Sequence, residues 1–419
     1  MSGQPTDPTE GRPPGDARQD QEPAGAADEQ PDFLHRATGV GTRLGRALLI
    51  PTLAIITALI LGAIIIAVTD IDILRLWGED PGEALSQSVE QVADAYTALF
   101  RGSIGSGRAI SETLFSATPL ILTGLAVALA FNAGLFNIGA NGQLHMGGMA
   151  ALWVGFSVDL PAYLLIPLAL VAAIIAGGIW GGIPGLLKAR TGAHEVITTI
   201  MFNFIALFFV NYLLTTRVFQ AEGRDDLISE PVNEAAELPL LFGSDYRVHV
   251  GFLIALGAVA FTHWLLYRSV LGFEFRAVGA NPEAARYAGM KPTLIFMLVM
   301  ATAGALAGLA GANQILGLEP YRAQSNFAGT TGFDGISIAL LGRSHPLGVL
   351  WAGLLFGALR AGGREMQGFA GIPIDLVIVI QALIIVFIAA PAVIRSLFRL
   401  PEEVESGEDT TVATSGWGA

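Results

Sequence analysis

Long runs without charged residues are the feature that most constrains the fold of this 419-residue chain. Several of these runs are long enough to cross a bilayer as helices. Hydrophobic residues make up 53% of the sequence and charged residues only 14%, which departs from soluble usage. We therefore predict an all-α fold, a polytopic transmembrane helical bundle with short broken helices. About ten spans are expected, with eight or nine as alternatives because three segments are short or rich in glycine. The segments are residues 47–68, 111–130, 144–155, 161–180, 196–215, 250–267, 293–316, 335–341, 347–359 and 374–390.

Acidic residues are concentrated at both ends of the chain and account for most of its net charge of -13. A composition rich in Gly, Pro, Asp and Glu is typical of disorder. We expect disordered acidic tails over residues 1–42 and 400–419 and a transmembrane domain over residues 43–399. No basic surface for nucleic acid is expected, and the absence of cysteine excludes disulfides and thiolate metal sites.

Arginines flank the first and the last predicted spans. Arg43 and Arg46 lie beside the first span, and Arg395 and Arg399 follow the last. Because positive residues favour the cytoplasmic side of a membrane, both termini are expected in the cytoplasm. Alternation along the spans then places residues 268–291 on the cytoplasmic side as well.

A short polar segment, RAVGANPEAARYAGMK at residues 276–291, carries a complete set of helix signals. The side chain of Asn281 can cap a helix, Pro282 suits its first position, and Glu283 favours the positive end of its dipole. Gly289 supplies a left-handed stop. We predict a cytoplasmic helix of about two turns, which needs a surface to lie against because so short a helix is marginal in water.

A second polar segment, FNAGLFNIGANGQLH at residues 131–145, interrupts the apolar pattern. An unpaired amide at membrane depth is costly, and interrupted helices there either line a cavity or are buried in protein. The amides therefore either line a solute path or join helices that nearby glycines allow to pack closely. Candidate path residues are Asn132, Phe136, Asn137, Asn141 and Gln143 in this segment, and Asn203, Asn313 and Asp334 elsewhere.

The segment GFDGISIALLGRSHP at residues 332–346 is a second interruption, in the other half of the chain. Two broken, glycine-rich elements in comparable positions suggest an internal duplication. Asp334 is expected either to gate the path or to cap the short helix predicted at residues 335–341, and we favour the cap.

Motifs for bond chemistry are absent from the sequence. His194 and Glu195 fall at the boundary of a predicted span, where helix capping or loop contacts are favoured over a proton relay or a metal site. The HExxH, nucleophile-elbow and Walker A patterns do not occur. We therefore expect no enzyme activity, no metal site and no cofactor in this chain. If ATP drives it, another chain must bind the nucleotide.

Four ordered motifs resemble permease subunits of bacterial ATP-binding-cassette (ABC) importers. They are FNIGANGQ, AHEVITTIMFNFIA from Ala193, FRAVGANPEAARYAGM and GFDGISIALLGRSHPLG. The resemblance covers residues 47–399 and indicates the branch for ribose-like sugars, branched-chain amino acids and nucleosides. FNIGANGQ is similar to the FNIGAEGQ of nucleoside-type and simple-sugar permeases, with Asn141 where that pattern usually carries Glu.

The resemblance also implies partners and a location. The implied partners are a cytoplasmic ATPase that binds ATP and Mg, a second paralogous permease subunit or a second copy of the chain, and an extracellular substrate-binding lipoprotein. The implied location is the bacterial plasma membrane. Residues 276–291 resemble a coupling helix, which docks on the ATPase and transmits its closure. Glu283 lies in the same helix. The residues that match the family pattern are Gly279, Asn281, Pro282, Ala284, Ala285, Arg286 and Gly289. A plain amphipathic loop helix is the alternative.

The motifs rank the solutes without deciding between them: a nucleoside first, a simple sugar second and a branched-chain amino acid third. The rival class is an ion- or proton-driven secondary transporter, which predicts titratable groups deep within the spans. A channel or scaffold without energy coupling would leave the capped cytoplasmic helix unexplained.

Overall fold

The structure is a computed structural model that describes residues 33–399, with side chains described from residue 49 onward except at residues 374 and 389. The chain divides into two units, Met1–Leu49 and Ile50–Ala419. Residues 1–32 and 400–419, which make up most of the predicted acidic tails, lie outside the described residues. Helix α1 (Phe33–Thr69) begins inside the range 1–42 that the composition assigns to a tail.

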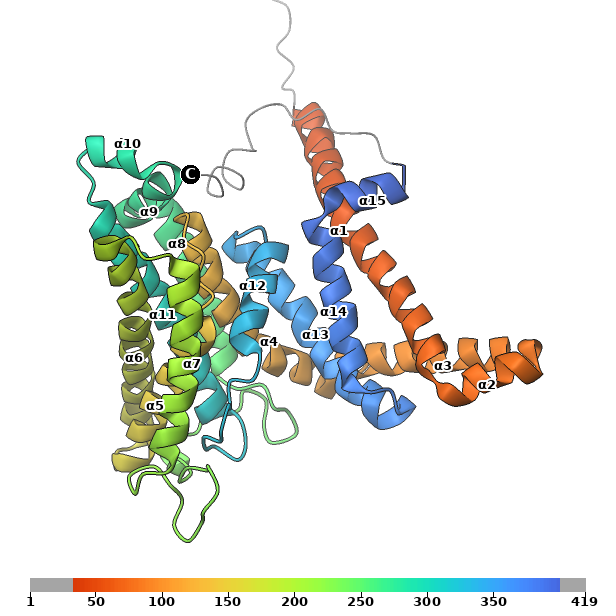
Figure 1. Cartoon of the computed structure of the whole chain (residues 1–419), viewed down its shortest axis with the longest axis horizontal. Helices are drawn as coiled ribbons and strands as arrows, with labels where there is room; N and C mark the ends of the chain where they lie inside the picture. The colour runs from red at the N-terminus through yellow and green to blue at the C-terminus, as the bar shows by residue number, and fades with distance from the viewer. Residues whose placement is uncertain (1–32, 400–419) are drawn as a thin grey trace, which may run out of the picture. The chain divides into compact units, whose positions relative to one another are not determined.

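The described residues form helices and connecting loops, with three isolated antiparallel bridges and no strand. This confirms the predicted all-α fold (Figure 1). After α1, the helices are α2 (Ile71–Glu79), α3 (Pro81–Ile104), α4 (Gly107–Asn132), α5 (Ala140–Ser157), α6 (Ala162–Thr191), α7 (Glu195–Leu214), α8 (Gly251–Arg268), α9 (Val270–Ala280), α10 (Pro282–Tyr287), α11 (Pro292–Gly317), α12 (Thr331–Leu341), α13 (Pro346–Ala370), α14 (Ile374–Ala389) and α15 (Pro391–Leu397).

Each of the ten predicted apolar segments falls on a helix. Within the described residues, seven helices are long and apolar enough to cross a membrane, and α14 with α15, which meet at 88°, make an eighth if they are counted as one span. The remaining two segments fall on the glycine-rich α5 and on α12, which has 11 residues. The polytopic helical bundle is therefore confirmed, with seven or eight spans by length and composition.

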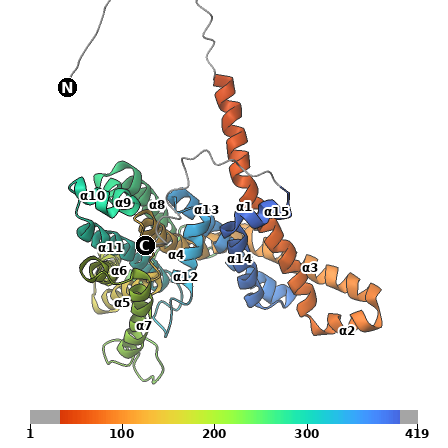
Figure 2. The ribbon, with the colours of Figure 1, turned by 45° about the horizontal axis from the view of Figure 1, so that its top comes forward.

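Helix α4 is the most buried of these spans, with 78% of its apolar window buried against 22% for α6 and for α7. It packs against α8, α11, α12 and α13, and it lies among helices in both views of the ribbon (Figure 1, Figure 2). The outer faces of α6 and α7 carry exposed apolar side chains such as Ile175 and Phe208. Apolar faces of this kind suit lipid or a neighbouring membrane subunit.

The most extensive helix contact, between α6 and α11, depends on glycine. A Cβ atom added at Gly177 would lie 2.3 Å from the Gly304 carbonyl oxygen, and one at Gly308 would lie 2.3 Å from the Ala173 carbonyl oxygen. No side chain fits between backbones at that separation. Small residues let membrane helices approach this closely and gain dispersion energy along their whole length.

Several predicted boundaries are wrong. The fourth segment was expected to end at residue 180, but α6 continues to Thr191. The ninth segment was expected to end at residue 359, but α13 continues through Arg360 and Arg364 to Ala370, because both guanidinium groups have carboxylate partners within the bundle. Asp334 does not cap α12: the helix begins at Thr331 after Thr330, so Asp334 lies within its first turn.

Candidate functional site

The capping prediction for α10 is confirmed in detail. The Asn281 side chain accepts a hydrogen bond from the Ala284 amide (2.9 Å), Pro282 occupies the first helical position, and Glu283 lies in the first turn. Gly289 has φ +88°, the left-handed conformation that stops the chain from continuing as a helix. The six-residue helix is therefore specified by its own sequence.

One side of α10 faces outward and the other faces the bundle. Glu283 and Arg286 form an exposed ion pair at 3.3 Å, and Tyr287 beside them is 94% exposed. Ala285 is buried in the core and its carbonyl oxygen accepts from the Met290 amide (3.0 Å), whereas Ala284 is exposed. The outward side thus offers a carboxylate, a guanidinium group and a phenol ring, of which the ring was not among the predicted residues.

The end of α9 fixes α10 to the centre of the bundle. A Cβ atom at Gly279 would lie 2.6 Å from the backbone carbon of Ala133, the residue that follows α4. Only glycine allows these backbones to meet. Because α10 is followed directly by α11, it is anchored to two of the helices that form the core.

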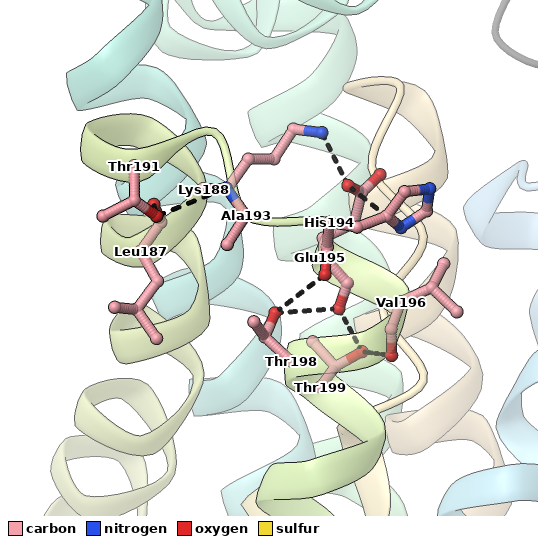
Figure 3. A network of polar contacts seen from close by, with 9 residues as sticks. All are labelled: Leu187, Lys188, Thr191, Ala193, His194, Glu195, Val196, Thr198 and Thr199. Carbon is pink, nitrogen blue, oxygen red and sulfur yellow. Dashed lines mark hydrogen bonds and ion pairs between the residues drawn. The ribbon is translucent and has the colours of Figure 1, made fainter.

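The turn between α6 and α7 lies at the same end of the bundle as α10. Lys188 and Glu195 form an ion pair across this turn at 2.6 Å, and the hydroxyl groups of Thr198 and Thr199 donate to the Glu195 carbonyl oxygen (Figure 3). The Lys188 ammonium also lies 5.6 Å from the ring centroid of Phe296, near the start of α11. These are the loop contacts expected for Glu195.

The amides of the FNIGANGQ segment are engaged with one another. Asn137 and Gln143 exchange two hydrogen bonds, each 3.1 Å long, between their side-chain amides. The Asn137 side chain also accepts from the Gly139 amide (3.0 Å). Both side chains are at most 1% exposed. These hydrogen bonds therefore stabilise the non-helical segment between α4 and α5, which we call the break before α5.

Two further asparagines tie this break to other helices. Asn203 of α7 accepts from the Gly142 amide (2.8 Å) and donates to the Ile138 carbonyl oxygen (2.9 Å). Asn141 donates to the Gly329 carbonyl oxygen (3.2 Å) and accepts from the Gly332 amide (3.0 Å) at the start of α12. The two interrupted elements noted in the sequence thus meet at Asn141.

Asn132 is the last residue of α4 and Phe136 follows it in the chain. Asn132 donates to the carbonyl oxygens of Ala128 and Ser344, both at 2.8 Å, and so joins α4 to the turn before α13. The Phe136 ring packs against Phe131 with centroids 4.9 Å apart.

A cavity of about 370 Å³ lies between α4, α11, α12, α13 and α14. Of the predicted path residues it brings together only Asn313 and Asp334. Asn132, Phe136, Asn137, Asn141, Gln143 and Asn203 do not line it. The lining residues are Phe115, Ser116, Pro119, Asn313, Gln314, Leu318, Thr330, Asp334, Arg360, Arg364, Val377, Ile378 and Gln381.

Charged groups around the cavity are paired. Asp334 forms an ion pair with Arg360 and accepts a hydrogen bond from the Thr330 hydroxyl (3.0 Å). Arg364 pairs with Glu112 of α4 at 3.3 Å and donates to the Ser116 hydroxyl at 2.6 Å. The predictions missed Arg360, Arg364 and Gln381, although the i, i+4 spacing of the two arginines already places them on one face of a helix.

Loop residues complete the surroundings of Phe115. Arg247 pairs with Glu112 at 3.1 Å, and its guanidinium carbon lies 4.3 Å from the centroid of the Phe115 ring. His249 contacts the edge of the same ring. Burial, together with the nearby charge of Arg247, lowers the pKa of His249 to about 4, so this imidazole is neutral at pH 7. Among the described side chains, which begin at residue 49, no group of three His, Asp or Glu residues is placed to hold a metal ion.

The cavity and α10 lie toward opposite ends of α11. Asn313 and Leu318 are near the C-terminal end of that helix, whereas α10 precedes its first residue, Pro292. At 1.5 Å per residue, about 30 Å of helix separates Pro292 from Asn313. That length is the thickness of the hydrocarbon core of a bilayer.

A family profile described as the permease component of a branched-chain amino acid transport system matches residues 109–389. The match includes α10, the α5 break and every cavity-lining residue. The chain belongs to this family. The chain is a multi-pass membrane permease, and the ATPase of such a transport system is a separate subunit.

Several relatives of the permease are ABC transporter subunits. The chain is 42% identical to the guanosine ABC transporter permease protein NupP of Bacillus subtilis, over 83% of this chain and 94% of the relative. It is 35% identical to the nucleoside ABC transporter permease protein NupB of Lactococcus lactis, over 87% and 97%. It is 41% identical to the glucose ABC transporter permease protein TsgB13 of Haloferax volcanii, over 70% and 80%. No solved structure matches the permease.

Proposed function

We propose that this chain is the membrane-spanning subunit of an ABC importer and forms the path for a nucleoside-like solute. The observation that carries the proposal is the similarity to two nucleoside permeases over more than four fifths of the chain. A simple sugar is the second solute, because a glucose permease is also similar at 41% identity. A branched-chain amino acid is the third.

The proposed partners follow from the division of labour in such importers. ATP and Mg belong to a cytoplasmic ATPase, a paralogous permease or a second copy of this chain completes the membrane part, and an extracellular lipoprotein delivers the solute. We place the importer in the plasma membrane with both termini in the cytoplasm. The exposed apolar faces of α6 and α7 are consistent with a lipid or subunit neighbour.

We assign the ATPase contact to α10. Its outward side carries Glu283, Arg286 and Tyr287, while Ala285 and the Gly279 backbone anchor it. A helix that is anchored to the bundle on one side and exposed on the other can transmit a movement of the ATPase to the bundle. Closure of the ATPase would therefore move α9, α10 and the start of α11 together and shift the bundle between two states that contact the solute differently.

The test is the charge reversal Arg286→Glu in the complete importer, reconstituted in vesicles. Removing one exposed ion pair changes the free energy of unfolding by less than about 0.5 kcal/mol, so the protein stays folded. ATP-driven guanosine uptake and association with the ATPase should both fall. Arg190→Glu is the matched control, since Arg190 is exposed in the last turn of α6 outside α10. Uptake that is equal in the two variants would remove α10 from the mechanism.

A secondary transporter is the second candidate, because the cavity contains the ion pair of Asp334 and Arg360. An ion-driven transporter needs such groups within the membrane. Uptake that continues after ion gradients are dissipated, and stops without ATP, supports the ABC importer. The reverse result supports the secondary transporter.

A further inference from the structure

Three buried amide atoms of the cavity-lining residues have no hydrogen-bond partner. They are Asn313 Nδ2, Gln314 Oε1 and Gln381 Nε2. Gln381 is 7% exposed and Asn313 is 5% exposed, so bulk water is not a ready partner. Leaving a buried donor or acceptor unpaired lowers stability, whereas an apolar side chain of similar shape would not. Asn313 Nδ2 lies against Gly251 at the start of α8, where an added Cβ atom would be 2.1 Å from it. A ligand in the cavity is therefore the candidate partner for Gln314 and Gln381.

The charged side chains at the cavity are all engaged by protein partners. Asp334 is engaged by Arg360 and Thr330, and Arg364 is engaged by Glu112 and Ser116. A neutral ligand can use the amides without breaking an ion pair.

The free atoms of Gln314 and Gln381 are one acceptor and one donor on different helices. Gln314 of α11 donates through Nε2 to the Thr331 hydroxyl (3.1 Å), which leaves its Oε1 as an acceptor. Gln381 of α14 has its Nε2 free as a donor. Phe115, Pro119 and Ile378 form apolar parts of the cavity lining. A flat heterocycle with an N–H and a C=O side by side matches this combination, as amide side chains match base edges elsewhere.

We propose that Gln314 and Gln381 are specificity-determining residues that bind the lactam edge of a nucleobase. In guanosine, the N1–H donates to Gln314 Oε1 and the O6 atom accepts from Gln381 Nε2. This inference rests on the proposed function and names the atoms that carry its selectivity. A sugar presents hydroxyl groups alone and has no lactam edge for the pair.

The experiment compares uptake of guanosine with that of purine riboside, which lacks both the N1–H and the O6 atom. Initial ATP-driven rates are measured in vesicles containing the complete importer, with the same extracellular binding protein throughout. Because that protein is common to every sample, its own preference contributes the same factor to the ratio of the two rates in every variant and cancels when variants are compared. Gln314→Met and Gln381→Met should each lower the guanosine to purine riboside ratio about tenfold, the effect of one lost buried hydrogen bond.

Gln91→Met is the matched control. Gln91 also has a buried unpaired atom, Oε1, but it lies on α3 outside the cavity, so its substitution should leave the ratio unchanged. Gln381→Asn, which keeps the amide but withdraws it by one methylene, should give an intermediate ratio and serves if Gln381→Met does not fold. A ratio that stays at the wild-type value in the cavity variants overturns the assignment of these residues. Failure of the wild type to take up either nucleoside overturns the proposed function instead.

Discussion

The break before α5 and the cavity beside α12 both place side-chain amides within the bundle, but they use them differently. At the break, Asn137 and Gln143 are paired with each other and Asn203 is paired with backbone groups. At the cavity, Gln314 and Gln381 each keep an unpaired polar atom. A membrane-buried amide needs a partner in either place. The comparison indicates that protein is the partner in the first region and solute in the second.

The largest expected effect is that of Asn137→Leu, which tests the first region. The substitution removes three hydrogen bonds and leaves the Gln143 amide and the Gly139 N–H unpaired. The free energy of unfolding, measured by titration with a denaturing detergent, should fall by about 2–4 kcal/mol.

Gln143→Leu added to Asn137→Leu should cost little further, because the two apolar side chains leave no unpaired side-chain amide. A favourable coupling of about 1–2 kcal/mol is expected in this double-mutant cycle. Asn211→Leu is the control, since Asn211 accepts one exposed hydrogen bond from Ser325 (2.9 Å). Equal losses for Asn137→Leu and Asn211→Leu would contradict a structural role for the break.

A smaller effect is expected from Asn141→Asp, which keeps the size of the side chain. The carboxylate can still accept from the Gly332 amide but cannot donate to the Gly329 carbonyl oxygen. Stability at neutral pH should fall by about 1–3 kcal/mol. The deficit relative to the wild type should shrink as the pH falls, because a protonated carboxyl group can donate again. A deficit that grows in acid would show that Asn141 does not join α5 to α12 through this bond.

The smallest effect on stability is expected for Gln381→Met at the cavity. The substitution removes a buried donor that has no partner and replaces it with an apolar side chain of similar length. The free energy of unfolding should stay within about 1 kcal/mol of the wild type or rise slightly. A loss as large as that of Asn137→Leu would mean that Gln381 is structural, and the contrast between the two regions would disappear.

The helices and the capped α10 could be predicted from the sequence because each depends on local chemistry. Apolar runs of sufficient length mark the spans, and Asn281, Pro282 and Gly289 mark the ends of α10. The continuation of α13 through Arg360 was missed because a charge usually ends an apolar run. The partner that permits it, Asp334, lies on another helix, and the sequence does not reveal that pairing.

Only some residues of the candidate site could be predicted from the sequence, for a related reason. The sequence identified amides that need partners, including Asn137 and Asn313, but residue type does not reveal which of them find protein partners. That depends on contacts between segments far apart in the chain, such as the one between Asn141 and Gly332. Gln381 was overlooked because a single amide in the long apolar helix α14 hardly changes its hydropathy.

The most direct test is a structure of the assembled importer with guanosine trapped in the membrane part. The account predicts the base in the cavity, with N1 within hydrogen-bond distance of Gln314 Oε1 and O6 within reach of Gln381 Nε2. The Asn137 and Gln143 amides should remain paired with each other. Guanosine bound at the break before α5, with that amide pair opened, would contradict it.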